Sequence, residues 1–193
     1  KGQQPHRYGS DFNVNGREDL RFGKVTLRAD EVKVTAFLEE NVESMGKGNG
    51  QGLSSYLSKC DPSPAIEVYS ENLKKDIYGS KQFFEELKSV MMQATDVLIY
   101  IHGYNVTWEE AVGSAIALQE MLNSPAAGDQ HQNVAVVLFS WPSDGSMFPF
   151  RAYFSDRGDA RDSGYAVGRG FLKLRDYLHE LRIQKQKGIT ELC

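Results

Sequence analysis

Two uninterrupted apolar runs stand out in the second half of the chain, over 97–101 and 134–139. Neither run alternates with polar positions, which is typical of a strand in a sheet that is covered on both faces. Both have the length of a strand and are far shorter than the roughly 20 residues that a membrane-spanning helix needs. We therefore predict buried strands over 96–101 and 134–140.

Residues with helical spacing surround these two strands. Three helices are predicted. The first runs from Ser80 to Gln93, and the third covers about 159–184 and ends before Gly188. The second begins at a capping box, in which Thr107 is followed three residues later by a glutamate, and ends near Asn123. The first helix has an apolar face formed by Phe83, Phe84, Leu87, Val90 and Met91. Helices that alternate with buried strands predict an α/β fold with a mainly parallel sheet and crossover helices.

The first part of the chain has a different pattern, because valine and threonine alternate there with charged residues. Such alternation predicts strands with one face in water. The predicted strands cover 23–28, 32–38 and 66–69. A glycine- and lysine-rich stretch over 45–52 is predicted to be a flexible loop. We divide the chain into a β-rich N-terminal arm over 1–79 and an α/β unit over 80–193.

Composition narrows the range of functions. The 193 residues suffice for one domain with an arm, and the formal net charge of −4 gives no general attraction to nucleic acid. No apolar run in the sequence is long enough for a membrane-spanning helix, so none is predicted. The compartment stays open between cytoplasmic and exported, because a signal peptide or lipid anchor would precede Lys1.

Cysteine and metal chemistry are not indicated. Cys60 lies in a polar turn and Cys193 is the last residue, and neither has a histidine nearby in the sequence, so no disulfide framework and no catalytic thiol are predicted. The sequence contains no HExxH, CxxC pair or EF-hand loop, so no metal or cofactor is predicted. The aspartates Asp156, Asp159 and Asp162 suit the start of a helix better than a metal cluster.

The most informative residues follow the two buried strands. His102-Gly103-Tyr104-Asn105 comes directly after the first and Ser140-Trp141-Pro142-Ser143 after the second. Ligands of open α/β sheets bind at these carboxyl ends, and backbone N–H groups of such a turn can stabilise a developing oxyanion. We predict a positive φ at Gly103. The alternative is a plain strand-to-helix turn, with a tryptophan that caps the core and a proline that ends the strand.

Three segments in this order resemble the bacterial α/β-hydrolase family of unknown function DUF900. They are His102–Val106, Phe139–Ser143 and Tyr153–Ala160, with weaker similarity in the arm at Tyr8–Ser10 and Leu20–Val25. The resemblance implies a serine hydrolase that acts on a small ester-like substrate. The backbone N–H of Tyr104, next to Gly103, would then donate to the oxyanion, while His102 would hold the loop and would not be the catalytic base. The predicted substrate-binding residues are Asn105, Trp141, Ser143 and Asp156.

The nucleophile that this fold requires is missing from the sequence. An elbow with the pattern G-x-S-x-G, or a histidine-serine variant of it, should follow the strand after the long helix, and no such motif occurs. Ser114 lies in mid-helix and Ser163 at a helix start, so neither is predicted to be the nucleophile. None of the histidines His6, His131 and His179 is placed as a base. We expect a chain truncated before the nucleophile strand, without turnover by itself, in which the triad lies beyond Cys193.

Truncation would also leave a sheet edge without a partner, and such an edge predicts pairing with a second copy of the chain. Two functions remain open at this point. The first is esterase- or lipase-like acyl hydrolysis by the complete protein. The second is a hydrolase-like fold used without catalysis, as a binding or scaffolding module. A strand that ends in a serine elbow just past Cys193 would favour the enzyme.

Overall fold

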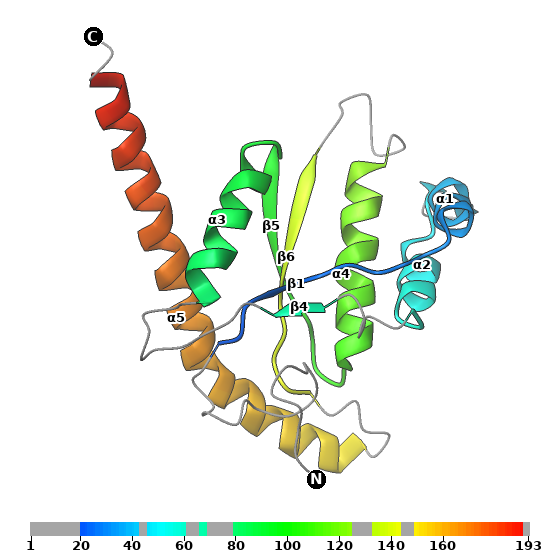
Figure 1. The fold of residues 1–193 in the computed structure, drawn as a ribbon. Coiled ribbons are helices and arrows are strands. Elements are labelled where there is room, and N and C mark those ends of the chain that lie inside the picture. Colours follow the sequence, from blue (N-terminus) through cyan, green and yellow to red (C-terminus); the bar gives the residue numbers. More distant parts are fainter. Residues whose placement is uncertain are drawn as a thin grey trace.

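Two parallel strands, β5 (Asp96–Ile101) and β6 (Val134–Phe139), lie at the centre of the computed structural model (Figure 1). Their register runs from Asp96 opposite Val134 to Ile101 opposite Phe139, so both strands end at the same edge. The parallel arrangement predicted for the two apolar runs is confirmed. The structure describes residues 20–42, 46–60, 66–68, 79–124, 133–143 and 149–190.

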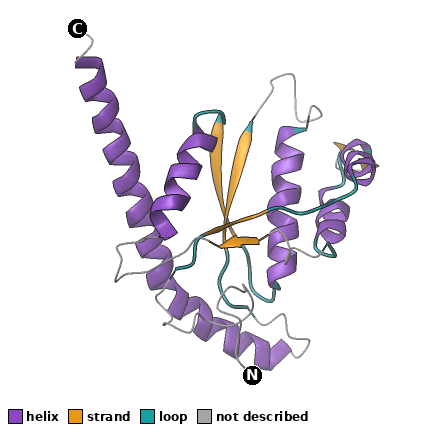
Figure 2. Ribbon diagram, viewed as in Figure 1, coloured by secondary structure: helices purple, strands orange, loops and turns teal. Residues whose placement is uncertain are grey.

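Helices lie on both sides of this strand pair (Figure 2). Helix α3 (Gly79–Met91) precedes β5, α4 (Trp108–Asn123) connects β5 to β6, and α5 (Pro149–Thr190) follows β6. Figure 1 places α3 and the middle of α5 on one side and α4 on the other. Strand, crossover helix and parallel strand form the expected α/β unit. Among the residues that the structure describes, no helix combines the length and the hydrophobicity needed to cross a membrane.

Helix α4 begins and ends where the sequence predicts. Thr107 caps it: its hydroxyl accepts the N–H of Glu110, and the Glu110 carboxylate accepts the N–H of Thr107 at 2.8 Å. Near its other end, α4 supplies two amide side chains to β6. Gln119 accepts the N–H of Val136 at 2.9 Å, and Asn123 accepts the N–H of Val134 at 2.7 Å and donates to its carbonyl oxygen at 3.0 Å.

Helix α5 is longer than the predicted helix over 159–184. It begins at Pro149, a residue suited to the first helical turn, and continues through Gly188, so the predicted break at that glycine is wrong. No proline follows residue 149 in the sequence, and a glycine alone weakens a helix without ending it. Ile189 and Thr190 also lie in α5, while 191–193 lie outside the described residues.

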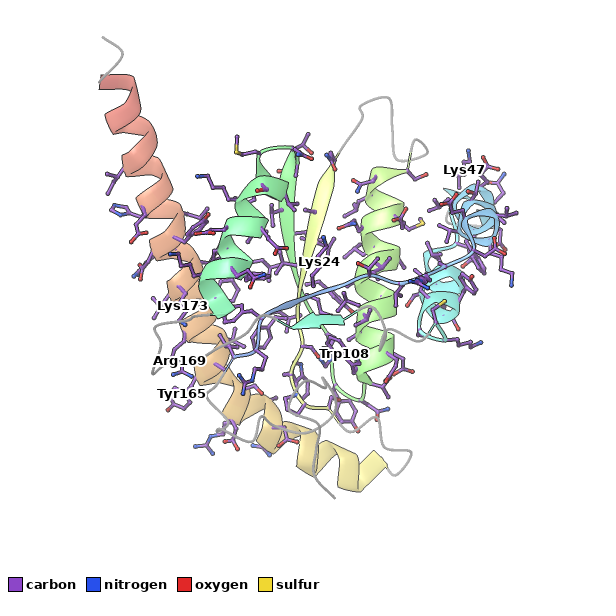
Figure 3. All side chains as sticks on the ribbon, viewed as in Figure 1. Lys24, Lys47, Trp108, Tyr165, Arg169 and Lys173 are labelled. Atoms are coloured by element: carbon purple, nitrogen blue, oxygen red, sulfur yellow. The ribbon has the colours of Figure 1, made fainter. Side chains whose placement is uncertain are left out.

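An aromatic cluster joins α5 to α3 and to the segment before β1. It consists of Phe22, Phe83, Phe84 and Tyr177. Phe84 is buried and stacks on Tyr177, with ring centroids 5.1 Å apart, and it lies 6.0 Å from the ring of Phe22. On α5, one turn before Tyr177, the ammonium of Lys173 lies 5.8 Å from the Phe22 ring (Figure 3).

The phenol of Tyr177 gives the fold a pH dependence in alkaline solution. Burial, and secondly the charge of Glu85, raise the pKa of Tyr177 above its usual value of 10.0. The folded state therefore holds this proton more tightly than the unfolded chain, and the resulting stability is present below pH 10.0 and is lost as the pH rises through the folded pKa. We expect the stability of Tyr177→Phe to fall less steeply with rising pH in this range. Urea midpoints between about pH 9 and about pH 11.5 test this.

The matched control is Tyr165→Phe, because Tyr165 also lies on α5 but is 74% exposed. This variant should keep the alkaline decline of the unmodified protein. Equal pH profiles for all three proteins would contradict the role given to Tyr177.

The N-terminal part of the chain contains more helix than the sequence pattern predicts. The first and third predicted strands are present in shorter form, as β1 (Gly23–Val25) paired antiparallel with β4 (Ile66–Val68). The predicted strand over 32–38 is wrong, because these residues lie in α1 (Glu31–Glu39). The Asp30 side chain caps that helix by accepting the N–H of Val32 at 3.0 Å. Its apolar residues Val34, Phe37 and Leu38 have helical spacing and pack against the core.

The prediction of a flexible loop over 45–52 is also wrong at 46–47 and 50–52, which lie in a strand and a helix. Strands β2 (Asn41–Val42) and β3 (Gly46–Lys47) pair, and α2 (Gly50–Leu57) begins directly afterwards. Gly46 and Gly48 have φ values of 87° and 103°, a conformation that glycine adopts without strain. The Asn49 side chain caps α2 by accepting the N–H of Gly52 at 2.7 Å.

Helix α2 packs against α4 and forms a core with it. Leu53, Leu57 and Ala117 are the buried members of this core. At the crossing, a Cβ atom on Gly113 would lie 2.6 Å from the backbone nitrogen of Ser58, so the two helices approach closely only because this residue is glycine. The hydroxyls of Ser54 and Ser114 lie 2.9 Å apart beside it. The N-terminal part is therefore packed against the α/β unit through α2.

Candidate functional site

The candidate site lies where β5 and β6 end. Because the two strands end in register, residues 102–107 and 140–143 leave the sheet side by side. Helix α4 begins at the same end of the molecule, where Figure 3 shows Trp108. The first half of α5 also lies at this end of the structure (Figure 1).

The imidazole of His102 connects the two strand ends. It is 3% exposed, and its Nε2 lies 3.2 Å from the Ser140 hydroxyl, 3.2 Å from the Trp141 nitrogen and 3.1 Å from the Trp141 carbonyl oxygen. Its Nδ1 lies 3.0 Å from the carbonyl oxygen of Gly103. Both ring nitrogens are therefore engaged within the protein.

Trp141 covers this imidazole and is bonded to the same residue. Its indole ring is parallel to the His102 ring within 3°, with centroids 5.3 Å apart. The indole N–H donates to the His102 carbonyl oxygen at 2.9 Å. Trp141, two residues after the end of β6, thus holds both the backbone and the side chain of His102.

A second connection lies further along both segments. Ser143 is 3% exposed, and its hydroxyl accepts the backbone N–H of Val106 at 3.1 Å. The next residue, Thr107, is the cap of α4. The loop after β5 is therefore held at its beginning through His102 and at its end through Ser143 and the capping box.

The predicted positive φ at Gly103 is wrong. The left-handed residue of this turn is Asn105, with a φ of 58°. Asparagine tolerates this conformation better than most residues because its side chain can form local hydrogen bonds. A Cβ atom on Gly103 would meet nothing within 4 Å, so neither conformation nor space requires glycine there.

The predicted site residues are placed as follows. His102, Trp141 and Ser143 come together in the two connections, while Gly103, Tyr104 and Asn105 lie on the exposed side of the loop, with Tyr104 46% exposed. Asp156 lies in α5, and its side chain is outside the described residues. Ser140 belongs to the quoted motif but was not predicted as a site residue. The strand register could have identified it, because Ile101 opposite Phe139 places His102 opposite Ser140.

Among the described residues, the other candidates for chemistry take no part in these two connections. Ser114 takes part in the crossing of α2 and α4, and Ser163 is a buried residue of α5 whose hydroxyl has no partner in the described part of the chain. Cys60 follows α2, and His179 is exposed on α5. The predictions for His6, His131 and Cys193 lie outside the described residues. Among the described residues, no group of three or more His, Cys, Asp or Glu side chains is arranged to hold a metal ion.

Ser143→Ala tests the second connection. The change leaves the partly buried N–H of Val106 without its Ser143 acceptor, so we expect a loss of unfolding free energy on the order of 1 kcal/mol. Hydrogen exchange at the Val106 amide should become faster than in the unmodified protein. Ser89→Ala on the exposed side of α3 is the matched control, with an expected change within about 0.5 kcal/mol. Unchanged exchange at Val106 would contradict the connection.

A family model described as an alpha/beta hydrolase of unknown function (DUF900) matches residues 79–185, more than half of the chain. This span contains the three segments on which the resemblance rests within the α/β unit, while Tyr8–Ser10 and Leu20–Val25 lie outside it. No curated protein and no solved structure matches the chain.

Proposed function

The chain belongs to the alpha/beta hydrolase family DUF900, and from this premise we propose that it supplies the oxyanion side of a serine hydrolase that cleaves an ester or related acyl bond. The observation that carries the proposal is the loop over 102–107, which leaves the carboxyl end of a parallel strand and is tied at both ends to the next strand end. An oxyanion donor stabilises a transition state only if it is held in place before the reaction begins.

In the proposed reaction, a serine oxygen attacks the carbonyl carbon of the substrate, and negative charge develops on the carbonyl oxygen. The backbone N–H of Tyr104 donates one hydrogen bond to this oxygen, and the N–H after the nucleophile donates another. The alcohol leaves, and water then hydrolyses the acyl-enzyme. This chemistry needs no metal or cofactor.

The roles of the other residues follow from their surroundings. His102 is proposed to hold the loop and not to act as the base, because both of its ring nitrogens lie within hydrogen-bond distance of protein atoms. Asn105, Trp141 and Asp156 are proposed substrate contacts. Ser143 was expected in the same group, but its buried hydroxyl already accepts the Val106 N–H, so we propose that it holds the loop.

The 193-residue sequence contains no G-x-S-x-G elbow, so the proposed nucleophile has to be identified chemically. A fluorophosphonate probe identifies it. The natural protein that carries this sequence, expressed from its own reading frame, is labelled and digested, and the modified peptide is identified by mass spectrometry. We expect one serine to be labelled in the folded protein and none after heat denaturation.

The same experiment separates the second candidate function, a hydrolase-like binding or scaffolding module. That candidate requires that no serine elbow follows the strand after the long helix. It predicts no labelled serine in folded protein and no hydrolysis of p-nitrophenyl acetate above the rate in buffer. Either a labelled serine or such turnover would contradict it.

A further inference from the structure

We propose that the outward side of α5 lies flat on a membrane surface that contains anionic lipids, with its arginines at the lipid phosphates and its apolar side chains at the top of the acyl chains. The inference goes beyond the proposed function and does not depend on it, because it concerns where the protein is held and not which bond it cleaves.

Helix α5 has one side that the protein buries and one that it leaves open. The buried side contains Ser163 and Ala166, each 5% exposed, and a Cβ atom on Gly170 would lie 3.3 Å from the Leu20 side chain. At 3.6 residues per turn, the opposite side carries five exposed residues, which we call the outer face of α5: Arg157, Arg161, Tyr165, Gly168 and Leu172.

The exposed charges along this half of the helix have one sign. Over 157–173, all of which the structure describes, the exposed charged residues are Arg157, Arg161, Arg169 and Lys173. The two aspartates of this stretch, Asp159 and Asp162, are half-buried. The chain as a whole has a formal net charge of −4, so the exposed charge of this stretch is opposite in sign to that of the whole molecule. An anionic surface would therefore attract the protein in one orientation, with α5 toward it.

Apolar side chains lie among these cations. Tyr165 is 74% exposed and Leu172, seven residues later on the same face, is 50% exposed, while the neighbouring Phe171 is 46% exposed. Figure 3 shows Tyr165 on the side of α5 that points away from α3 and the sheet. Tyrosine favours the boundary between membrane and water, and arginine can lay its stem along apolar surface while its guanidinium stays at the headgroups. A helix face with this combination binds in the plane of the interface.

Two other occupants fit the outer face less well. A second copy of α5 would bring the arginines of one outer face against those of the other, and like charges in contact disfavour association. A nucleic acid would offer phosphates to Arg157 and Arg161 but no apolar partner to Leu172 along its backbone. An anionic bilayer offers both, because its phosphates lie directly above the acyl chains.

The test uses the natural protein that carries this sequence, and vesicles of phosphatidylcholine either alone or mixed with an equal part of phosphatidylserine. We expect the protein to sediment with the mixed vesicles and to bind far less to phosphatidylcholine alone, or in about 0.5 M NaCl. Arg157→Gln combined with Arg161→Gln should weaken binding to the mixed vesicles by about 10- to 30-fold.

The matched control is Arg28→Gln combined with Lys59→Gln, which removes the same charge from exposed positions in the N-terminal part. It should change binding by less than about twofold, because these cations do not belong to the outer face. Both double variants should keep the circular dichroism spectrum of the unmodified protein, since all four side chains are exposed.

Leu172→Gln tests the apolar contribution. It should weaken binding by about 3- to 10-fold without changing the salt dependence, because the side chain leaves water when the face binds. The control is Val32→Gln on α1, where the valine is 78% exposed, and it should leave binding unchanged. In Tyr165→Trp, the added indole should be quenched by lipids with brominated acyl chains, after subtraction of the change seen in the unmodified protein.

The inference would be overturned if the mixed vesicles are not bound, if both kinds of vesicle are bound equally, or if the two double variants bind alike. An added indole that brominated lipids do not quench would also overturn it. A DNA duplex that binds the unmodified protein but not the Arg157→Gln, Arg161→Gln variant, with no binding to vesicles, would assign the outer face to a nucleic acid instead. None of these measurements requires turnover, so they hold whether or not a serine is labelled.

Discussion

Replacing Phe84 with alanine is expected to lower the free energy of unfolding by about 3–5 kcal/mol. Phe84 is 7% exposed on α3 and stacks on Tyr177 of α5, with Phe22 and Phe83 at the edges of its ring. Its removal leaves a cavity where three segments distant in sequence meet. The loss therefore includes the transfer energy of the ring and the contacts that the surrounding aromatic side chains no longer make.

Phe171→Ala is the matched control, because it removes the same side chain from α5 at a position that is 46% exposed. Its expected cost is below about 1 kcal/mol. Urea denaturation followed by circular dichroism measures both values. Equal losses in the two variants would show that the aromatic cluster does not hold α5 to α3.

Gly113→Ala is expected to be the second largest perturbation, with a loss of about 2–3 kcal/mol. In an unobstructed helix the same change would stabilise by up to about 1 kcal/mol, because alanine has the higher helix propensity. At Gly113 the new Cβ would lie 2.6 Å from the Ser58 nitrogen and 2.9 Å from the Ser54 oxygen. Ser54 lies in α2 and Ser58 directly follows it, and both atoms belong to the backbone. Backbone atoms cannot move aside as the end of a flexible side chain can, so α2 and α4 must separate.

Gly168→Ala is the matched control. It is the same substitution, but we expect it to change the free energy of unfolding in the opposite direction. Gly168 lies in α5, where a Cβ atom would meet nothing within 4 Å. We expect a gain of about 0.5–1 kcal/mol there. A stabilising effect at both positions would refute the close crossing of α2 and α4.

The elements that the sequence predicts well are those with a strong local signal. A few consecutive residues suffice to recognise the apolar runs of β5 and β6 and the capping box of α4. The structure confirms these elements. Residues 32–38 are ambiguous, because valines and threonine alternate with charge while Val34, Phe37 and Leu38 also have helical spacing. The Asp30 cap and the partner surface of α2 decide in favour of a helix, and that surface is not visible in the local pattern.

The candidate site was predictable to a similar degree. The motifs predicted which two segments meet, since both follow parallel strands. The partners within them depend on register, which brings His102 beside Ser140, and on the path of the turn, which puts the left-handed residue at Asn105 and not at Gly103. Neither follows from residue types alone, because both glycine and asparagine tolerate a positive φ.

The amide side chains that α4 supplies to β6 determine the direction in which the sheet can be extended. The backbone groups of Val134 and Val136 that face away from β5 are already bonded to Asn123 and Gln119. A further strand on that side would have to displace α4 along the first half of β6. In the part of the chain that the structure describes, β5 pairs only with β6. A strand added to this sheet would therefore pair beside β5, whose carboxyl end leads into the loop over 102–107.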